Sequence, residues 1–133
     1  MWPFQNRESK KRTPCVSIGD IVATWGQDGW SFSDGTIDFT MYENDIFDTS
    51  ILHKLPDLRT WISNLQTEID AIINEHVADW GLERDDREIV AIDVSRLATE
   101  NQVDVAYGCE QWADYGVNIV ITNGRITESY GGD

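Results

Sequence analysis

The sequence predicts an α+β protein, with an antiparallel sheet of about six strands in βββ-α-βββ order and one long amphipathic helix packed on one face. Two groups of alternating apolar and polar segments flank a single stretch of helical periodicity. Strands gathered in runs around one helix are typical of α+β proteins, whereas parallel α/β sheets alternate strand with helix. The 41% hydrophobic content, which includes six Trp, four Tyr and four Phe, is sufficient for a core and argues against global disorder.

The first group of strands occupies residues 16–42. Turn signals at residues 26–29 and at Asp34-Gly35 divide this range into three stretches, and the second and third stretches alternate apolar with polar side chains. We therefore expect three antiparallel strands with one apolar face and one polar face, as in a sheet that is covered on one side.

A long amphipathic helix is predicted from about Pro56 to Trp80. An acidic connection, residues 43–55, precedes it, and Pro56 with Asp57 forms a typical helix start. Apolar side chains then recur at three- and four-residue spacing, which places them on one stripe of the helix. The stripe residues expected to be buried include Trp61, Leu65, Ile69 and Ile72. His76 lies on the same stripe, so we interpret it as a residue at the edge of the core rather than a ligand.

The second group of strands follows a polar loop at residues 83–87. Three stretches are rich in β-branched residues, and they cover residues 89–94, 103–107 and 117–122. Asn123-Gly124 is a tight-turn signal, so a short last strand at Arg125 and Ile126 is compatible with the pattern.

The chain divides at Pro14 into a basic tail, residues 1–14, and a single acidic domain, residues 15–133. The tail carries a net charge of +3, while the domain holds six Lys and Arg against 23 Asp and Glu, a net charge of −17. We expect the tail to be flexible, because chain ends are usually disordered unless they are tied down. Its aromatic residues Trp2 and Phe4, ahead of a basic run, leave open a weak contact with an anionic membrane.

The sequence also predicts a cytoplasmic protein. No apolar run approaches the roughly 20 residues needed to span a bilayer, and the tail lacks the apolar region of a secretory signal. Cys15 and Cys109 are interpreted as two free thiols, as expected in that compartment.

The negative charge of the domain predicts the kind of partner. It repels nucleic acid and anionic membranes and attracts basic proteins, with a screening length of roughly 8 Å at physiological salt. We therefore expect a basic protein partner and no direct binding of nucleic acid. The oligomeric state is not constrained by these features.

No motif in the sequence predicts catalysis, a cofactor or a metal. The chain has no Walker loop, dinucleotide-binding glycine pattern, nucleophile elbow or zinc-ligand spacing. Residues 28–35 lack the alternating ligands and the closing Glu of an EF-hand loop. A nucleophilic Cys109 would need a positioned base, and neither His53 nor His76 stands at a recognisable spacing from it. Cys109 is therefore interpreted as a strand-end residue.

Two acidic loops are the predicted partner-binding sites. The loop from Tyr107 to Gly116 mixes aromatic with acidic residues, a composition typical of binding loops. Its carboxylates are expected to face a partner, while Trp112 and Tyr115 either contact the partner or fold inward to cap the sheet. The other loop is the acidic connection before the helix. The predicted contact residues are Asp45, Asp48, Glu110, Trp112 and Asp114.

The small size, the acidity, the α+β order and the strand texture of residues 21–25 (IVATW) and 37–42 (IDFTMY) make the chain resemble bacterial immunity proteins. Such proteins belong to contact-dependent or polymorphic toxin systems. The resemblance implies a protein that neutralises a basic toxin, commonly a nuclease, by covering its active site with an acidic surface. Two alternatives stay open: a nucleic-acid mimic that inhibits a DNA- or RNA-binding protein, and a small enzyme.

Overall fold

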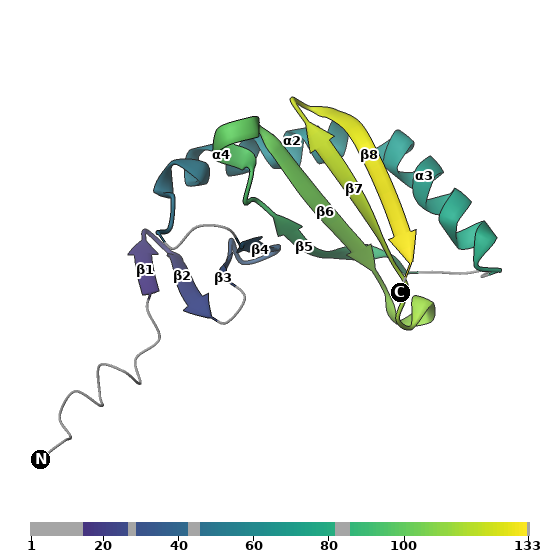
Figure 1. The fold of residues 1–133 in the computed structure, drawn as a ribbon, viewed down its shortest axis with the longest axis horizontal. Helices are drawn as coiled ribbons and strands as arrows, with labels where there is room; N and C mark the ends of the chain where they lie inside the picture. Colours follow the sequence, from purple (N-terminus) through teal and green to yellow (C-terminus); the bar gives the residue numbers. More distant parts are fainter. Residues whose placement is uncertain (1–14, 27–28, 43–45, 82–85, 133) are drawn as a thin grey trace, which may run out of the picture.

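The computed structural model describes residues 15–26, 29–42, 46–81 and 86–132. Its centre is an eight-stranded sheet whose strands neighbour one another in chain order. The strands are β1 (Cys15–Ile18), β2 (Ile21–Gly26), β3 (Gly29–Ser33), β4 (Asp38–Met41), β5 (Glu88–Asp93), β6 (Gln102–Gly108), β7 (Gly116–Thr122) and β8 (Arg125–Gly132). The helical segments are η1 (Thr49–Lys54), α2 (Leu55–Asn64), α3 (Gln66–Asp79), α4 (Leu97–Glu100) and η2 (Glu110–Trp112). Figure 1 shows α2 and α3 behind the sheet formed by β5 to β8.

The predicted α+β class is confirmed, but the prediction of about six strands was too low. The first predicted strand is a hairpin, because Gly19, at φ 60°, and Asp20 turn the chain between β1 and β2. The last strand is longer than expected, since β8 covers eight residues and pairs with β7 along most of its length.

The sheet is not wholly antiparallel, which corrects a second part of the prediction. β4 and β5 run parallel, with Phe39 opposite Ile92 and Thr40 opposite Asp93. Between them the chain passes through η1, α2 and α3, and a helical crossover of this kind returns the chain in its original direction. All other neighbouring pairs are antiparallel.

The predicted long helix is interrupted at Leu65, which separates α2 from α3. Leu65 has φ −98° and ψ 4°, outside the helical range, although its N–H still bonds to the Trp61 carbonyl at 3.0 Å. Ser63 and Asn64 immediately precede this point, and both residue types have low helix propensity. The buried stripe continues across the break with Leu58, Ile62, Leu65, Ile69, Ile73 and Val77.

Burial of Leu65 and Ile69 is confirmed, whereas Trp61 and Ile72 are only partly buried at the margin of the core. His76 is also only partly exposed, and it lies against β8: a Cβ added to Gly131 would come within 2.8 Å of the His76 Nδ1 atom. Gly131 therefore permits the close approach of α3 to the last strand. Among the described helices, none is long and apolar enough to cross a bilayer.

The two faces of the sheet differ in chemistry. A row of directly paired residues, Phe39, Ile92, Val105 and Ile119, crosses β4 to β7 and is almost entirely buried with the helix stripe. The adjacent row crosses β4 to β8 on the opposite face. It consists of Thr40, Asp93, Asp104, Val120 and Glu128. The helices thus cover an apolar face and leave a polar face uncovered.

We predict that Ile69→Ala lowers the free energy of unfolding by about 2 to 5 kcal/mol, because Ile69 is 0% exposed at the helix–sheet contact. Glu75→Ala on the exposed side of α3 is the matched control and should stay within about 0.5 kcal/mol of the wild type. Urea unfolding measures both values. Equal stability of the two variants would contradict the packing of α3 on the sheet.

Candidate functional site

The candidate site is the uncovered face of the sheet, meaning the face that carries the row from Thr40 to Glu128. A bulge in β5 enlarges this face, because the register shifts between Ile89 and Ala91. The extra residue in a bulge leaves the regular alternation, so Val90 reaches the uncovered side beside Ala91 and is 56% exposed. Two hollows on this face contain carboxylates, and both are lined in part by Tyr130.

The first, which we call the carboxylate hollow, has a volume of about 470 Å³ and lies over β5 to β8. Its floor contains Asp93, Asp104 and Glu128. Asp104 is held in place from two sides, since its oxygens accept hydrogen bonds from Tyr130 Oη at 2.5 Å and from Asn118 Nδ2 at 2.8 Å.

Asp93 is also held in a fixed orientation. Its Oδ1 atom accepts hydrogen bonds from the backbone N–H of Ser95 at 2.9 Å and from Ser95 Oγ at 2.6 Å. Asp93 and Asp104 are direct cross-strand partners, and like charges in that position destabilise a sheet. The uncovered face therefore concentrates negative charge at a cost in stability.

Tyr130 stays protonated in this surrounding. Its hydrogen bond to the Asp104 carboxylate raises the pKa of Tyr130 to about 12, and burial and the charges of Asp104 and Glu128 add to the shift. The neutral phenol donates a hydrogen bond to the Asp104 carboxylate, so this contact is lost when Tyr130 ionises as the pH rises toward about 12.

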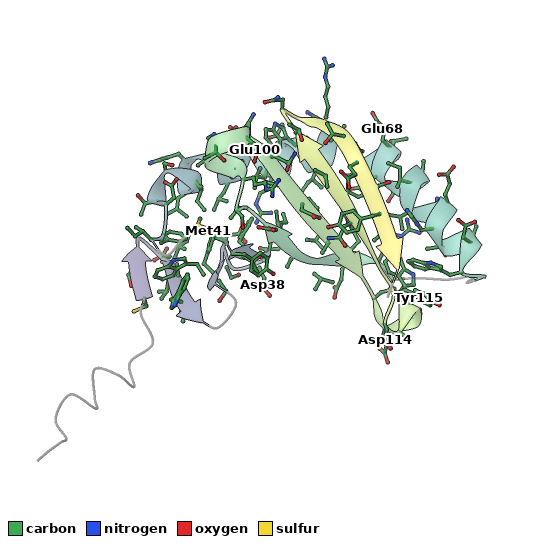
Figure 2. The ribbon with its side chains drawn as sticks, in the orientation of Figure 1. Asp38, Met41, Glu68, Glu100, Asp114 and Tyr115 are labelled. Atoms are coloured by element: carbon green, nitrogen blue, oxygen red, sulfur yellow. The ribbon has the colours of Figure 1, made fainter. Side chains whose placement is uncertain are left out.

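The second, which we call the loop hollow, has a volume of about 660 Å³ and lies where β6, β7 and β8 meet the β6–β7 loop. Apolar groups of Val90, Ala106 and Ala113 line it, together with the rings of Tyr115 and Tyr130. Its carboxylates are those of Glu88, Glu110 and Asp114. Figure 2 shows Asp114 and Tyr115 at this end of the sheet.

Aromatic packing fixes the β6–β7 loop against the end of α3. Trp112 is 1% exposed and meets the Trp80 ring edge-on, with 5.5 Å between the ring centroids. The Tyr115 ring stacks on the same Trp80 ring, with 4.7 Å between the two ring centroids. Gln111 adds a polar tie, since its side chain donates to Asp86 Oδ2 and accepts from the Asp86 N–H. The loop therefore presents Glu110 and Asp114 from a supported backbone.

The structure separates the predicted contact residues. Glu110 and Asp114 are exposed and lie together in the loop hollow. Trp112 is 1% exposed and folds inward, so this structure does not present its ring at the surface for a partner. Asp48 lines neither hollow, and its side chain caps η1 by accepting a hydrogen bond from the Ser50 N–H at 3.0 Å. Asp45 lies outside the described residues, as does the tail at 1–14.

The sequence prediction missed the acidic residues that project from the strands. Asp93 and Asp104 occupy the polar positions of alternating strands, flanked by valine and isoleucine, so the outward direction of each could have been derived from its neighbours. Their cross-strand pairing depends on the register, which the sequence does not specify. Tyr130 was missed because the last strand was expected to be short.

The described part of the chain contains no group of three or more His, Cys, Asp or Glu side chains arranged to hold a metal. Cys109 is a free thiol that follows the end of β6 and lines the loop hollow, but neither histidine lines this hollow or the carboxylate hollow. Comparisons of the chain with protein-family models, with curated proteins and with solved structures gave no match.

We predict that Tyr130→Phe changes the alkaline stability of the protein. The pKa of Tyr130 is about 12 in the fold and about 10 when unfolded, so its contribution to stability is complete below pH 10 and is lost as pH rises toward 12. The wild type should therefore lose more stability than the variant between pH 9.5 and pH 12, as measured by urea unfolding. Equal losses would contradict the Tyr130–Asp104 hydrogen bond.

We predict that Trp112→Ala destabilises the fold by about 3 to 5 kcal/mol, because it removes a fully buried ring. Glu110→Ala, two residues away and exposed, should change the free energy of unfolding by less than about 0.5 kcal/mol. Thermal unfolding compares the two. A stable Trp112→Ala protein would mean that the ring does not anchor the loop.

Proposed function

We propose that this protein binds a basic protein through the uncovered face of its sheet and neutralises it, as an immunity protein neutralises a toxin. The observation that carries the proposal is the charge of the two hollows. Six carboxylates line them, and in the described chain Arg96 is the only Lys or Arg side chain that does. A partner with a positive surface complements this face, and a negative surface does not.

The net charge of the whole chain supports the same partner. At −14 it produces a long-range attraction for cations, and such steering raises association rates toward 10⁸ to 10⁹ M⁻¹s⁻¹ at low salt. A rapid encounter suits a protein that must capture a toxin before the toxin reaches its target. The fixed orientation of Asp93 and Asp104 lowers the entropy lost when the contact forms.

The nucleic-acid mimic is less well supported. Mimicry of a phosphate backbone calls for a long row of regularly spaced negative charges. On the uncovered face Asp93 and Asp104 stand side by side, but Val120 interrupts the row before Glu128 and Thr40 ends it on the other side. The charge forms a compact patch rather than a line.

The geometry also gives little support to an enzyme. The titratable groups with large shifts among the residues that line the hollows are Tyr107 and Tyr130, and a pKa of about 12 is too high for a general base near neutral pH. Cys109 has no histidine beside it in the loop hollow, so the pairing that activates a thiol is missing from the residues described there.

The first experiment identifies the partner. The immobilised protein is incubated with lysate from its source cell, the retained proteins are identified by mass spectrometry, and each candidate is expressed with and without this protein. We expect a basic protein that inhibits growth and whose toxicity is relieved by co-expression. Retention of acidic proteins alone, or toxicity that co-expression does not relieve, would contradict the proposal.

We predict that neutralising the uncovered face slows association with this partner. The variant Glu88→Gln/Glu128→Gln removes two charges from the face, and Glu68→Gln/Glu75→Gln removes two from α3, where Figure 2 places Glu68. Both variants have a net charge of −12, so overall attraction is matched. The first should reduce the association rate several-fold at low salt, and the second much less.

Stopped-flow or surface binding measurements at two salt concentrations provide the rates. Added salt should slow association of the wild type and shrink the difference between the variants. Equal rates for the two variants would mean that the uncovered face is not the contact surface. Association that is independent of salt would contradict electrostatic steering as a whole.

A further inference from the structure

The loop hollow differs from the rest of the acidic surface because its floor is apolar. Of the six large hydrophobic side chains that are strongly exposed in the described chain, three line this hollow: Val90, Tyr115 and Tyr130, with exposures of 56%, 43% and 46%. Ala106 and Ala113 extend the same floor. Exposed apolar groups gathered in one depression are typical of binding sites rather than of ordinary surface.

The backbone keeps this floor open. Val90 stands in the β5 bulge directly beside Gly108, where an added Cβ would lie 3.1 Å from the Val90 Cγ2 atom. Gly108 therefore lets Val90 lie close to β6. The volume of about 660 Å³ falls within the 300 to 1,000 Å³ typical of ligand sites, which is sufficient for a long side chain with its flanking backbone.

The rim of the hollow has one sign of charge. The Glu88 side chain belongs to β5, and those of Glu110 and Asp114 belong to the β6–β7 loop. No Lys, Arg or His occurs among the described residues that line it. The occupant that fits an apolar floor with a carboxylate rim has an apolar stem and a cationic end.

We infer that the loop hollow binds one arginine side chain from an extended segment of the basic partner. The inference rests on the proposed function and deepens it by assigning the anchor. The methylene groups of the arginine lie on Val90 and Ala106, and the guanidinium group meets the carboxylates of the rim. Arginine fits better than lysine, because its planar group stacks on tyrosine rings and bonds to a carboxylate through two parallel N–H groups.

An anchor of this kind controls how long the complex lasts. Charges at the edge of an interface mostly affect encounter, while a buried contact at a supported site mostly affects dissociation. The loop hollow is supported by the buried Trp112 and by the stacking of Tyr115 on Trp80, so it needs little rearrangement to receive the side chain.

A peptide probe tests the site without knowledge of the partner. The probe is acetyl-Ser-Gly-Arg-Gly-Ser-amide, and two comparison peptides carry lysine or citrulline in place of arginine. Citrulline keeps the shape of arginine but has no charge. Nitrogen-15 spectra of the labelled protein, recorded during titration at low salt, give the dissociation constant and the residues whose amide signals shift.

We expect saturable shifts at Val90, at residues 106–110 and at residues 113–116. The citrulline peptide should bind at least tenfold more weakly than the arginine peptide, and the lysine peptide should lie between them. Shifts spread equally over α2 and α3, or equal binding of all three peptides, would overturn the inference in favour of diffuse charge attraction.

Two kinds of variant separate the charge from the shape of the hollow. Glu110→Gln/Asp114→Asn removes two rim charges, and Glu75→Gln/Asp79→Asn makes the same chemical change on exposed positions of α3. The first should weaken binding of the arginine peptide about tenfold, and the second less than twofold. Val90→Thr keeps the size and all charges but makes the floor polar, so it should also weaken binding.

Ala106→Leu gives an independent check, because it fills the floor while every carboxylate remains. Peptide binding should be lost even though the melting temperature is retained.

If Ala106→Leu and Val90→Thr both bind normally, the hollow is not the site. If the peptide fails to bind but the basic partner is still captured with salt-dependent association, the anchor is refuted and the proposed function stands. Peptide binding without capture of any basic protein would refute the proposed function alone.

Discussion

The structure depends on one constraint: the helical layer covers a single face of the sheet. The chain leaves β4, forms η1, α2 and α3, and returns to begin β5 beside and parallel to β4. The paired row of Phe39, Ile92, Val105 and Ile119 finds its apolar partners only on that side. The opposite face has no layer of its own in the described chain, so it carries polar and charged side chains. The exposure of one sheet face thus follows from this arrangement, and Asp93, Asp104 and Glu128 lie on that exposed face.

The covered side also shapes the end of the uncovered side. Trp80, at the end of α3, packs against both Trp112 and Tyr115 of the β6–β7 loop. The core therefore positions the loop that carries Glu110 and Asp114. A displacement of the end of α3 would also displace this loop and change the shape of the loop hollow on the other face. The bulge in β5 has a comparable effect, because it brings Val90 to the uncovered side without disturbing the buried Ile92.

Much of the fold could be derived from local patterns. The alternation in residues 30–41 and 103–122, and the burial of Leu65 and Ile69, follow from side-chain periodicity. The parallel pairing of β4 with β5 and the register that sets Asp93 opposite Asp104 are long-range features, and local patterns do not contain them. For the same reason the loop carboxylates Glu110 and Asp114 could be proposed from sequence, while their meeting with Glu88 and Tyr130 required the structure. Trp112 shows most clearly what local patterns cannot predict, because an aromatic side chain in a polar loop can point either into the core or toward a partner.

The central claim is that the uncovered face is the interaction surface. Methyl NMR of the labelled protein, free and bound to the basic partner, tests it most directly, because methyl groups report on each face separately. The claim predicts large shifts for Val90, Ala106 and Val120 on the uncovered face, and small shifts for Ile69, Ile73 and Val77, which are buried on the helices. Unchanged Val90, Ala106 and Val120 signals in a saturated complex would contradict the account and move the interface to another part of the molecule.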